Sequence, residues 1–168
     1  MTTLFAQPYD LAAVGFYFAN AEEYATKAAV LRNDYGQPVE EFEIQFIDGE
    51  DMDYALAEAW GLNQVNLRRF LDVVEDWDEQ QKLRFIIAVG ECGYAFDLQD
   101  GDPDEFDVDI YETETMRELA EQFVEEGLFG DIAEHLAAYI DYDAIARDLA
   151  MDYAETTIAG RHLIYRCG

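Results

Sequence analysis

The sequence predicts an α+β protein, and three observations support that prediction. Residues 41–47 alternate apolar and polar side chains, as a half-buried strand does. Residues 67–87 place apolar side chains at helical spacing instead. The predicted strands and helices do not alternate regularly along the chain, which argues against a doubly wound parallel sheet.

The N-terminal part is predicted to begin with a strand and a helix. Residues 15–20 are typical of a short strand that ends at Asn20. Asn20 and Glu23, three residues apart, resemble a capping box, which opens a helix through about Arg32. Gly36 and the proline shortly after it would close this helix.

A second strand and a short helix are predicted to follow. The alternating run 41–47 forms the strand, and Asp48–Gly49 turns the chain. The helix then covers about residues 53–60 and ends at Gly61.

The middle of the chain is predicted to be a helical hairpin. Apolar residues over 67–77 and again over 83–87 recur at helical spacing. Charge is near balance here, because four of the ten basic residues of the chain fall in this segment. They are Arg68, Arg69, Lys82 and Arg84.

The C-terminal part is predicted to mix strands and helices. Residues 105–111 alternate as a strand does, and a helix is expected over 114–126. Asp131 and Asp141 are candidate N-caps of two further helices, the first of which runs through Ile140. The run 156–166 is typical of a β-hairpin.

The charge of the chain limits its partners. Thirty-eight acidic residues against ten basic ones give a net charge of −28. Direct binding to nucleic acid or to an anionic membrane is therefore excluded, because both would repel the protein. A disordered acidic tail is excluded as well, because 14% of the residues are aromatic. A negative electrostatic field of this strength, in a chain that can fold, favours imitation of a polyanion.

The chain lacks the residues that most enzyme mechanisms require. Serine is absent, which removes the serine nucleophile. Cys92 and Cys167 are expected to be reduced and structural, since His135 and His162 are the only histidines that could activate them. No zinc-ligand spacing and no phosphate-binding glycine motif occurs, so we expect no metal and no cofactor. No apolar run is long enough for a membrane helix, and the expected location is cytoplasmic.

Calcium is the strongest alternative use of the acidic residues. Asp100, Asp102 and Asp104 occupy positions 1, 3 and 5 of an EF-hand-like loop. Glu105 stands where the loop needs glycine, and Tyr111 stands where it needs a bidentate glutamate. We therefore do not expect a specific calcium site. A carboxylate hydrolase, a halophilic-type soluble domain and an acidic binding module for a basic protein, such as a nucleoid protein or a toxin, remain alternatives.

The acidic residues follow the periods of the predicted elements. On a strand, Glu105, Asp107 and Asp109 would share one face at about 6.6 Å spacing, close to the spacing of DNA phosphates. On the next helix, four glutamates would form a ridge of like charge with no interleaved Lys or Arg. They are Glu114, Glu118, Glu121 and Glu125.

Four blocks of sequence resemble the ArdA-type antirestriction proteins. They are Gly-Phe-Tyr-Phe at 15–18, Pro-Val-Glu-Glu-Phe-Glu-Ile-Gln-Phe-Ile-Asp-Gly at 38–49, Glu-Glu-Gly-Leu-Phe-Gly at 125–130 and Tyr-Ile-Asp-Tyr-Asp-Ala-Ile-Ala-Arg-Asp-Leu at 139–149. The last two blocks are the most specific, and the resemblance runs nearly end to end.

The resemblance implies a non-enzymatic inhibitor encoded by mobile genetic elements. Members of this family are elongated homodimers with three small domains in each chain. Their acidic surface imitates bent B-form DNA and occupies the DNA-binding groove of type I restriction–modification enzymes. By analogy, this chain would divide into an α+β unit at 1–61, a helical unit at 62–101 and an α+β unit at 102–168. The last unit would form the dimer interface.

The resemblance also points to the residues of the surface. The acidic surface would comprise Glu40, Glu41, Glu43, Asp48, Glu50, Asp51, Asp53, Asp102, Asp104, Glu105, Asp107, Asp109, Glu112, Glu114, Glu118, Glu121, Glu125 and Glu126. Candidates for the dimer interface are Tyr139, Ile140, Tyr142 and Ile145, for which a place in the core of the unit is an equal alternative. The four basic residues of the middle segment depart from uniform imitation of DNA.

Overall fold

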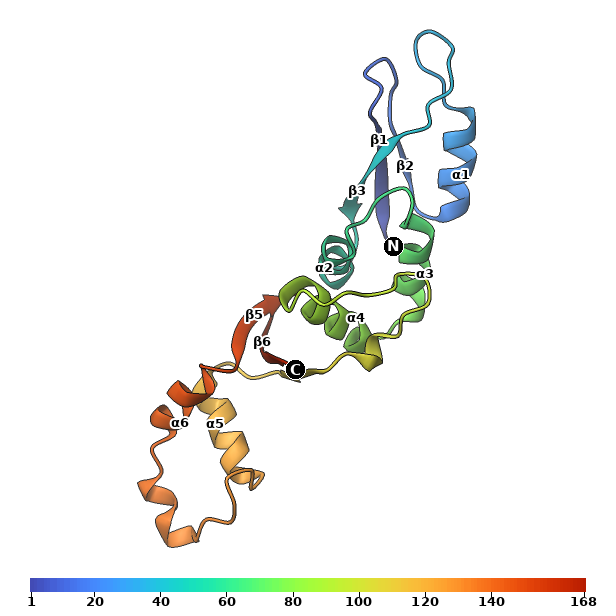
Figure 1. The fold of residues 1–168 in the computed structure, drawn as a ribbon. Coiled ribbons are helices and arrows are strands. Elements are labelled where there is room, and N and C mark those ends of the chain that lie inside the picture. Colours follow the sequence, from blue (N-terminus) through green and yellow to red (C-terminus); the bar gives the residue numbers. More distant parts are fainter. The chain divides into compact units, whose positions relative to one another are not determined.

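The computed structural model describes residues 1–168, and its internal contacts divide the chain into two compact units, 1–106 and 107–168 (Figure 1). Each unit has one three-stranded antiparallel sheet together with helices, so the predicted α+β class is confirmed. The further division into three small units, with boundaries at Gly61 and Gly101, stays a prediction.

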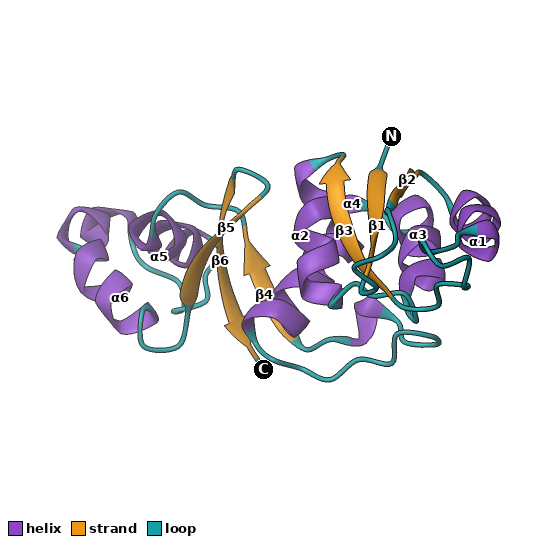
Figure 2. Cartoon of the chain, turned by 90° about the horizontal axis from the view of Figure 1, so that it is seen from above, coloured by secondary structure: helices purple, strands orange, loops and turns teal.

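The sheet of the first unit has the order β2-β1-β3, with β1 at Thr3–Pro8, β2 at Phe16–Phe18 and β3 at Phe42–Asp48. Figure 2 shows β1 between its two neighbours. β2 and β3 confirm the predicted strands, whereas β1 was not predicted. Leu4, Ala6 and Pro8 are its buried residues, and a proline is unfavourable in a central strand.

Four α-helices and a π-helical turn lie with this sheet in the first unit. They are α1 at Ala21–Val30, α2 at Asp51–Trp60, α3 at Leu67–Asp76, α4 at Glu79–Phe85 and η1 at Ile86–Glu91. Asn20 caps α1 as predicted, because its side chain accepts a hydrogen bond from the Glu23 amide at 2.8 Å. Gly61 ends α2 in the left-handed conformation, with φ of 65°.

The predicted helical hairpin is wrong in its pairing. α4 packs against α2 rather than against α3. Large aromatic side chains explain this choice, since the rings of Trp60 on α2 and Phe85 on α4 lie 5.2 Å apart. Asp78 starts α4 directly after α3 with a capping box to Gln81, so the chain changes direction there.

The second unit has a sheet of order β4-β6-β5. Its strands are β4 at Val108–Tyr111, β5 at Ala154–Ile158 and β6 at Arg161–Cys167, and its α-helices are α5 at Met116–Glu125 and α6 at Tyr142–Leu149. Leu119 and Phe123 of α5 pack on Ile164 of β6 in its core. The predicted hairpin is confirmed, and it turns at Ala159 and Gly160 with positive φ at both.

Two predicted elements of the C-terminal part are wrong. Only Val108–Tyr111 of the run 105–111 is a strand, because Pro103–Glu105 forms a 3₁₀ turn, η2, immediately before it. The helix expected from Asp131 to Ile140 is instead a 3₁₀ segment, η3, at Glu134–Tyr139. η3 buries no side chain, so tertiary packing does not stabilise a full α-helix there.

Candidate functional site

Six acidic residues of the first unit lie exposed on β3, just before it and at the start of α2. Alternation along β3 buries Phe42 and Ile44 and leaves the intervening Glu43 in solvent. The first turn of α2 attracts negative charge, because the helix dipole is positive there. The six residues are Glu40, Glu41, Glu43, Asp48, Glu50 and Asp51.

Asp53 departs from the other acidic residues of this region. It is 5% exposed, and its carboxylate accepts a hydrogen bond from the ammonium of Lys82 at 2.7 Å. Lys82 is 8% exposed, so the two charges neutralise each other inside the unit. Asp53 therefore presents no charge to a partner.

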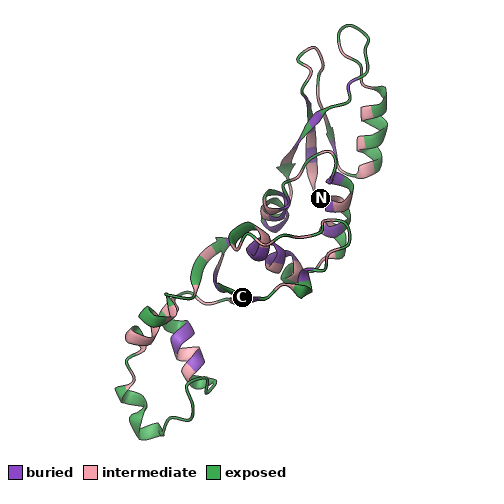
Figure 3. Ribbon diagram, in the orientation of Figure 1, coloured by how far each residue is buried: buried purple, intermediate pink, exposed green.

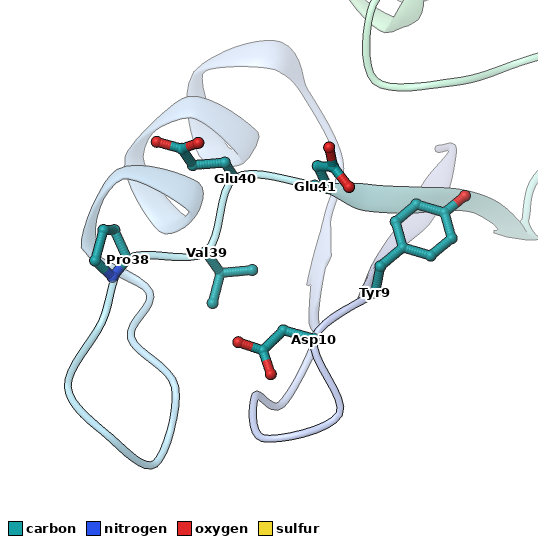
Figure 4. A pocket seen from close by; sticks show the side chains of 6 residues that line it. All are labelled: Tyr9, Asp10, Pro38, Val39, Glu40 and Glu41. Atoms are coloured by element: carbon teal, nitrogen blue, oxygen red, sulfur yellow. The ribbon is translucent and has the colours of Figure 1, made fainter.

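An open pocket of about 390 Å³ lies beside the exposed acidic residues that precede β3 (Figure 4). It is lined by Tyr9, Asp10, Pro38, Val39, Glu40 and Glu41. The three carboxylates stand around the pocket and do not converge on one point. This geometry suits a distributed negative surface rather than a catalytic pair or a metal site.

Asp10 is an acidic residue of this surface that the sequence analysis did not identify. Its carboxylate accepts hydrogen bonds from the side-chain amide of Asn33 and from the backbone N–H of Ala12, both at 2.9 Å. These bonds hold the pKa of Asp10 below its usual value, chiefly through Asn33. Asp10 and Asn33 are 23 residues apart, so this contact could not be predicted from the sequence.

The basic residues of the middle segment reduce the acidic field less than their number suggests. Lys82 is buried against Asp53, and Arg84 is half-buried and donates to the carbonyl of Phe106 at 2.9 Å. Of the other two, Arg68 is exposed and Arg69 is partly buried. Exposed acidic residues also occur on α3, namely Asp72, Glu75 and Asp76.

The predicted row of Glu105, Asp107 and Asp109 does not lie on one strand. Glu105 belongs to η2 in the first unit, and Asp107 begins the second unit just before β4. The acidic residues from 102 to 107 are all exposed. They are Asp102, Asp104, Glu105 and Asp107. Asp102 caps η2, because its carboxylate accepts from the Asp104 amide at 2.9 Å.

Four acidic residues of the second unit are paired with three arginines, and each arginine offsets one negative charge locally. Arg166 pairs with Asp109 at 2.6 Å, and Arg161 pairs with Glu112 at 2.7 Å. Arg117 pairs with both Asp143 at 2.7 Å and Glu121 at 3.2 Å. The expected ridge without interleaved basic residues is therefore wrong, because Arg117 lies one turn before Glu121 on α5.

The arginine pairs shift the pKa values of their members. The hydrogen bonds from Arg161 hold the pKa of Glu112 below its usual value. The pKa of Arg117 is raised by its bonds to Asp143, at 2.7 Å, and to Glu121. Glu112 and Arg117 therefore stay ionised near neutral pH. The bond from Arg117 to Asp143 also links α5 to α6.

The remaining glutamates of α5 and its flanks are exposed. Thr115 caps the helix, and the Glu118 carboxylate reaches back to accept from the backbone N–H of Glu114 at 3.0 Å. Near the other end, Glu126 accepts from Gln122 at 3.0 Å. Exposed carboxylates thus flank the helix at both ends, and they are Glu114, Glu118, Glu125 and Glu126.

The dimer-interface candidates lie outside the buried core of the second unit. Tyr139 is 83% exposed, whereas Ile140, Tyr142 and Ile145 are partly buried. The whole segment 127–139 is exposed, as Figure 3 shows. It carries further large apolar side chains that the sequence analysis did not single out, namely Leu128, Phe129, Ile132 and Leu136.

Other kinds of site find little support within either unit. No group of three or more His, Cys, Asp or Glu side chains is placed to hold a metal ion. Neither Cys92 nor Cys167 is a free thiol, so the expectation of reduced cysteines is wrong. No helix has the length and apolar character needed to cross a membrane.

Comparison with known proteins identifies one family. A family model described as antirestriction protein (ArdA) matches residues 9–161. The match covers both units almost completely, and it includes all four sequence blocks noted above. No curated protein matches the chain.

Proposed function

Because the chain belongs to the ArdA family of antirestriction proteins, we propose that it inhibits type I restriction–modification enzymes by imitating B-form DNA. The observation that carries this proposal is the exposure of the carboxylates around β3, α2, η2 and α5. A DNA-binding groove is lined with basic side chains that neutralise phosphates. A folded surface of carboxylates offers the same charge to that groove without being a substrate.

Local spacing supports imitation of a phosphate backbone. Glu118, Glu121 and Glu125 follow one another at three and four residues on α5, and such neighbours are roughly 5–6 Å apart. Successive phosphates of a DNA strand are separated by a distance of the same order. The net charge of −28 corresponds to the phosphates on about 48 Å of duplex axis.

The proposed activity is inhibition rather than catalysis. Serine is absent, and the carboxylates around the open pocket do not form a converging pair. His162 makes a close contact from its Nδ1 to the Thr113 carbonyl oxygen at 2.6 Å, which is a structural role within the second unit. Inhibition would occur in the cytoplasm, where restriction enzymes meet incoming DNA.

We further propose that the protein acts as a homodimer joined through its second unit. Large apolar side chains exposed over 127–139, and Tyr139 above all, are costly to leave in water. A second copy would cover them together with the partly buried Ile140, Tyr142 and Ile145. Two chains would also double the length of DNA that the carboxylates can imitate.

Inhibition of purified enzymes tests the proposed function. The chain should block cleavage of an unmodified plasmid by a type I restriction enzyme and should leave cleavage by a type II enzyme unchanged. The type II enzyme is the control for nonspecific capture of magnesium by the carboxylates. Equal inhibition of both enzymes, or of neither, would contradict the proposal.

A further inference from the structure

The outer edge of β3 carries unpaired backbone groups. Tyr9 donates to the carbonyl of Glu41 at 3.2 Å, which fixes the hydrogen-bonding pattern between β1 and β3. Hydrogen-bonded pairs alternate along an antiparallel ladder. The backbone N–H and C=O groups of Phe42, Ile44 and Phe46 therefore point away from β1.

Side chains cover other backbone groups on the edges of this sheet. The amide of Gln64 accepts from the Phe42 N–H at 2.6 Å and donates to the Glu40 carbonyl at 3.2 Å, as a neighbouring strand would. At the opposite edge of the sheet, the ammonium of Lys27 donates to the Tyr17 carbonyl at 2.7 Å. Covering of exposed edges is the usual defence against unwanted pairing.

Ile44 and Phe46 are left without such cover. Their outward N–H and C=O groups have no hydrogen-bond partner, and the strand borders a pocket of about 260 Å³. The pocket is mainly apolar, with the rings of Phe46 and Tyr54 in T-shaped contact at 5.6 Å. An open strand edge beside an apolar pocket is the arrangement that binds an extended peptide by strand addition.

Charge selects the kind of peptide. Glu58 lines the pocket, and Glu43 and Asp48 are exposed on β3 itself. No basic residue lines the pocket. We propose that the Ile44–Phe46 edge binds an extended basic segment of a protein partner, with lysine or arginine alternating with apolar residues.

The geometry sets the size of the bound segment. Three residues of a strand span about 10 Å, so the segment from Ile44 to Phe46 can form up to four backbone hydrogen bonds. Side chains of the added strand alternate in direction, which allows one apolar side chain to enter the pocket while its basic neighbours, on the other face, reach Glu43. This site differs from the proposed DNA imitation because it requires backbone pairing as well as charge.

Peptide titration followed by NMR tests the site. The ¹⁵N-labelled full chain is titrated with acetylated and amidated Lys-Val-Lys-Val-Lys. We expect the amides of Ile44 and Phe46 to shift most and to exchange with solvent at least about tenfold more slowly when bound. Shifts spread over all acidic segments, with unchanged exchange at these two amides, would overturn the proposal.

Two peptides of identical charge separate strand pairing from simple attraction. One carries N-methyl groups on its lysine amides and the other on its valine amides, so that each loses the donors on one edge. Strand addition predicts that one pattern abolishes binding and the other preserves it. Equal binding of both peptides would overturn the proposal.

A matched pair of variants tests whether acidic residues beside the Ile44–Phe46 edge attract the peptide. Glu43→Lys should weaken binding of the unmodified peptide by about two- to fivefold, the range of an exposed ion pair, because Glu43 lies on the face that the lysines reach. Glu22→Lys makes the same charge change on α1, beside the opposite edge of the sheet, and should have a smaller effect. Equal weakening by both variants would contradict a local site. Absence of any peptide binding would overturn this proposal, and it would leave the proposed inhibition of restriction enzymes unaffected.

Discussion

The ammonium of Lys82 on α4 lies 2.7 Å from a carboxylate oxygen of Asp53 on α2, and both side chains are buried. The pair joins two helices that the sequence had assigned to different units. It also removes one acidic and one basic residue from the surface. A buried pair of this kind is costly to break, because the remaining partner keeps an uncompensated charge.

Lys82→Met should therefore lower the free energy of unfolding by about 3–5 kcal/mol. The double variant Lys82→Met/Asp53→Leu should lose less, because it leaves no charge unpaired. Urea denaturation measures both. If the single and double variants were equally stable, the ion pair would not be the reason for the loss.

The pKa of Glu112 provides a pH-dependent test. Since Arg161 lowers this pKa in the native state, the pair stabilises the fold above the usual glutamate pKa, and the stabilisation is lost as the pH falls through the lowered value. Arg161→Met should raise the pKa of Glu112, as measured by NMR titration of its carboxyl carbon. Arg166→Met removes the partner of Asp109 instead and should leave the Glu112 pKa nearly unchanged.

Inhibition should follow the net charge of the acidic surface. Glu114→Gln/Glu125→Gln removes two exposed charges and should weaken inhibition between about two- and thirtyfold, as the loss of two surface ion pairs would. Asp109→Asn/Arg166→Gln removes an ion pair without changing the net charge, and inhibition should stay within about twofold. Equal effects in a quantitative cleavage assay would contradict an electrostatic mechanism.

Dimerisation should depend on the exposed apolar segment of the second unit. Tyr139→Glu should shift the protein toward monomer in sedimentation equilibrium, because burying a glutamate in an interface is unfavourable. Tyr35→Glu is the matched control, since Tyr35 is 80% exposed in the first unit and Tyr139 is 83% exposed. If both variants kept the same association constant, Tyr139 would lie outside any interface.

Local patterns predicted the elements that depend on neighbouring residues. The alternation along β3, the Asn20 cap and the left-handed Gly61 each follow from a few adjacent positions, and each is found. The prediction of an α-helix over 134–139 was wrong, because such a helix depends on packing against distant residues. Its helix-like sequence has no core to pack against within the chain, so it forms only 3₁₀ turns.

Pairings between distant residues could not be predicted in this way. Asp109 and Arg166 are directly opposite on β4 and β6, but their 57-residue separation becomes a contact only through the register of the strands. The Lys82–Asp53 pair likewise needs α4 to pack on α2. The sequence therefore overstated both the free acidic charge of the second unit and the basic charge of the middle segment.

Competition with DNA tests imitation most directly. A fluorescent duplex that carries the recognition sequence is bound to a purified type I methyltransferase, and the chain is titrated at several duplex concentrations. The account predicts complete displacement of the duplex, with an apparent inhibition constant that rises in proportion to the amount of duplex. Binding of the chain to the enzyme while the duplex stays bound would contradict it.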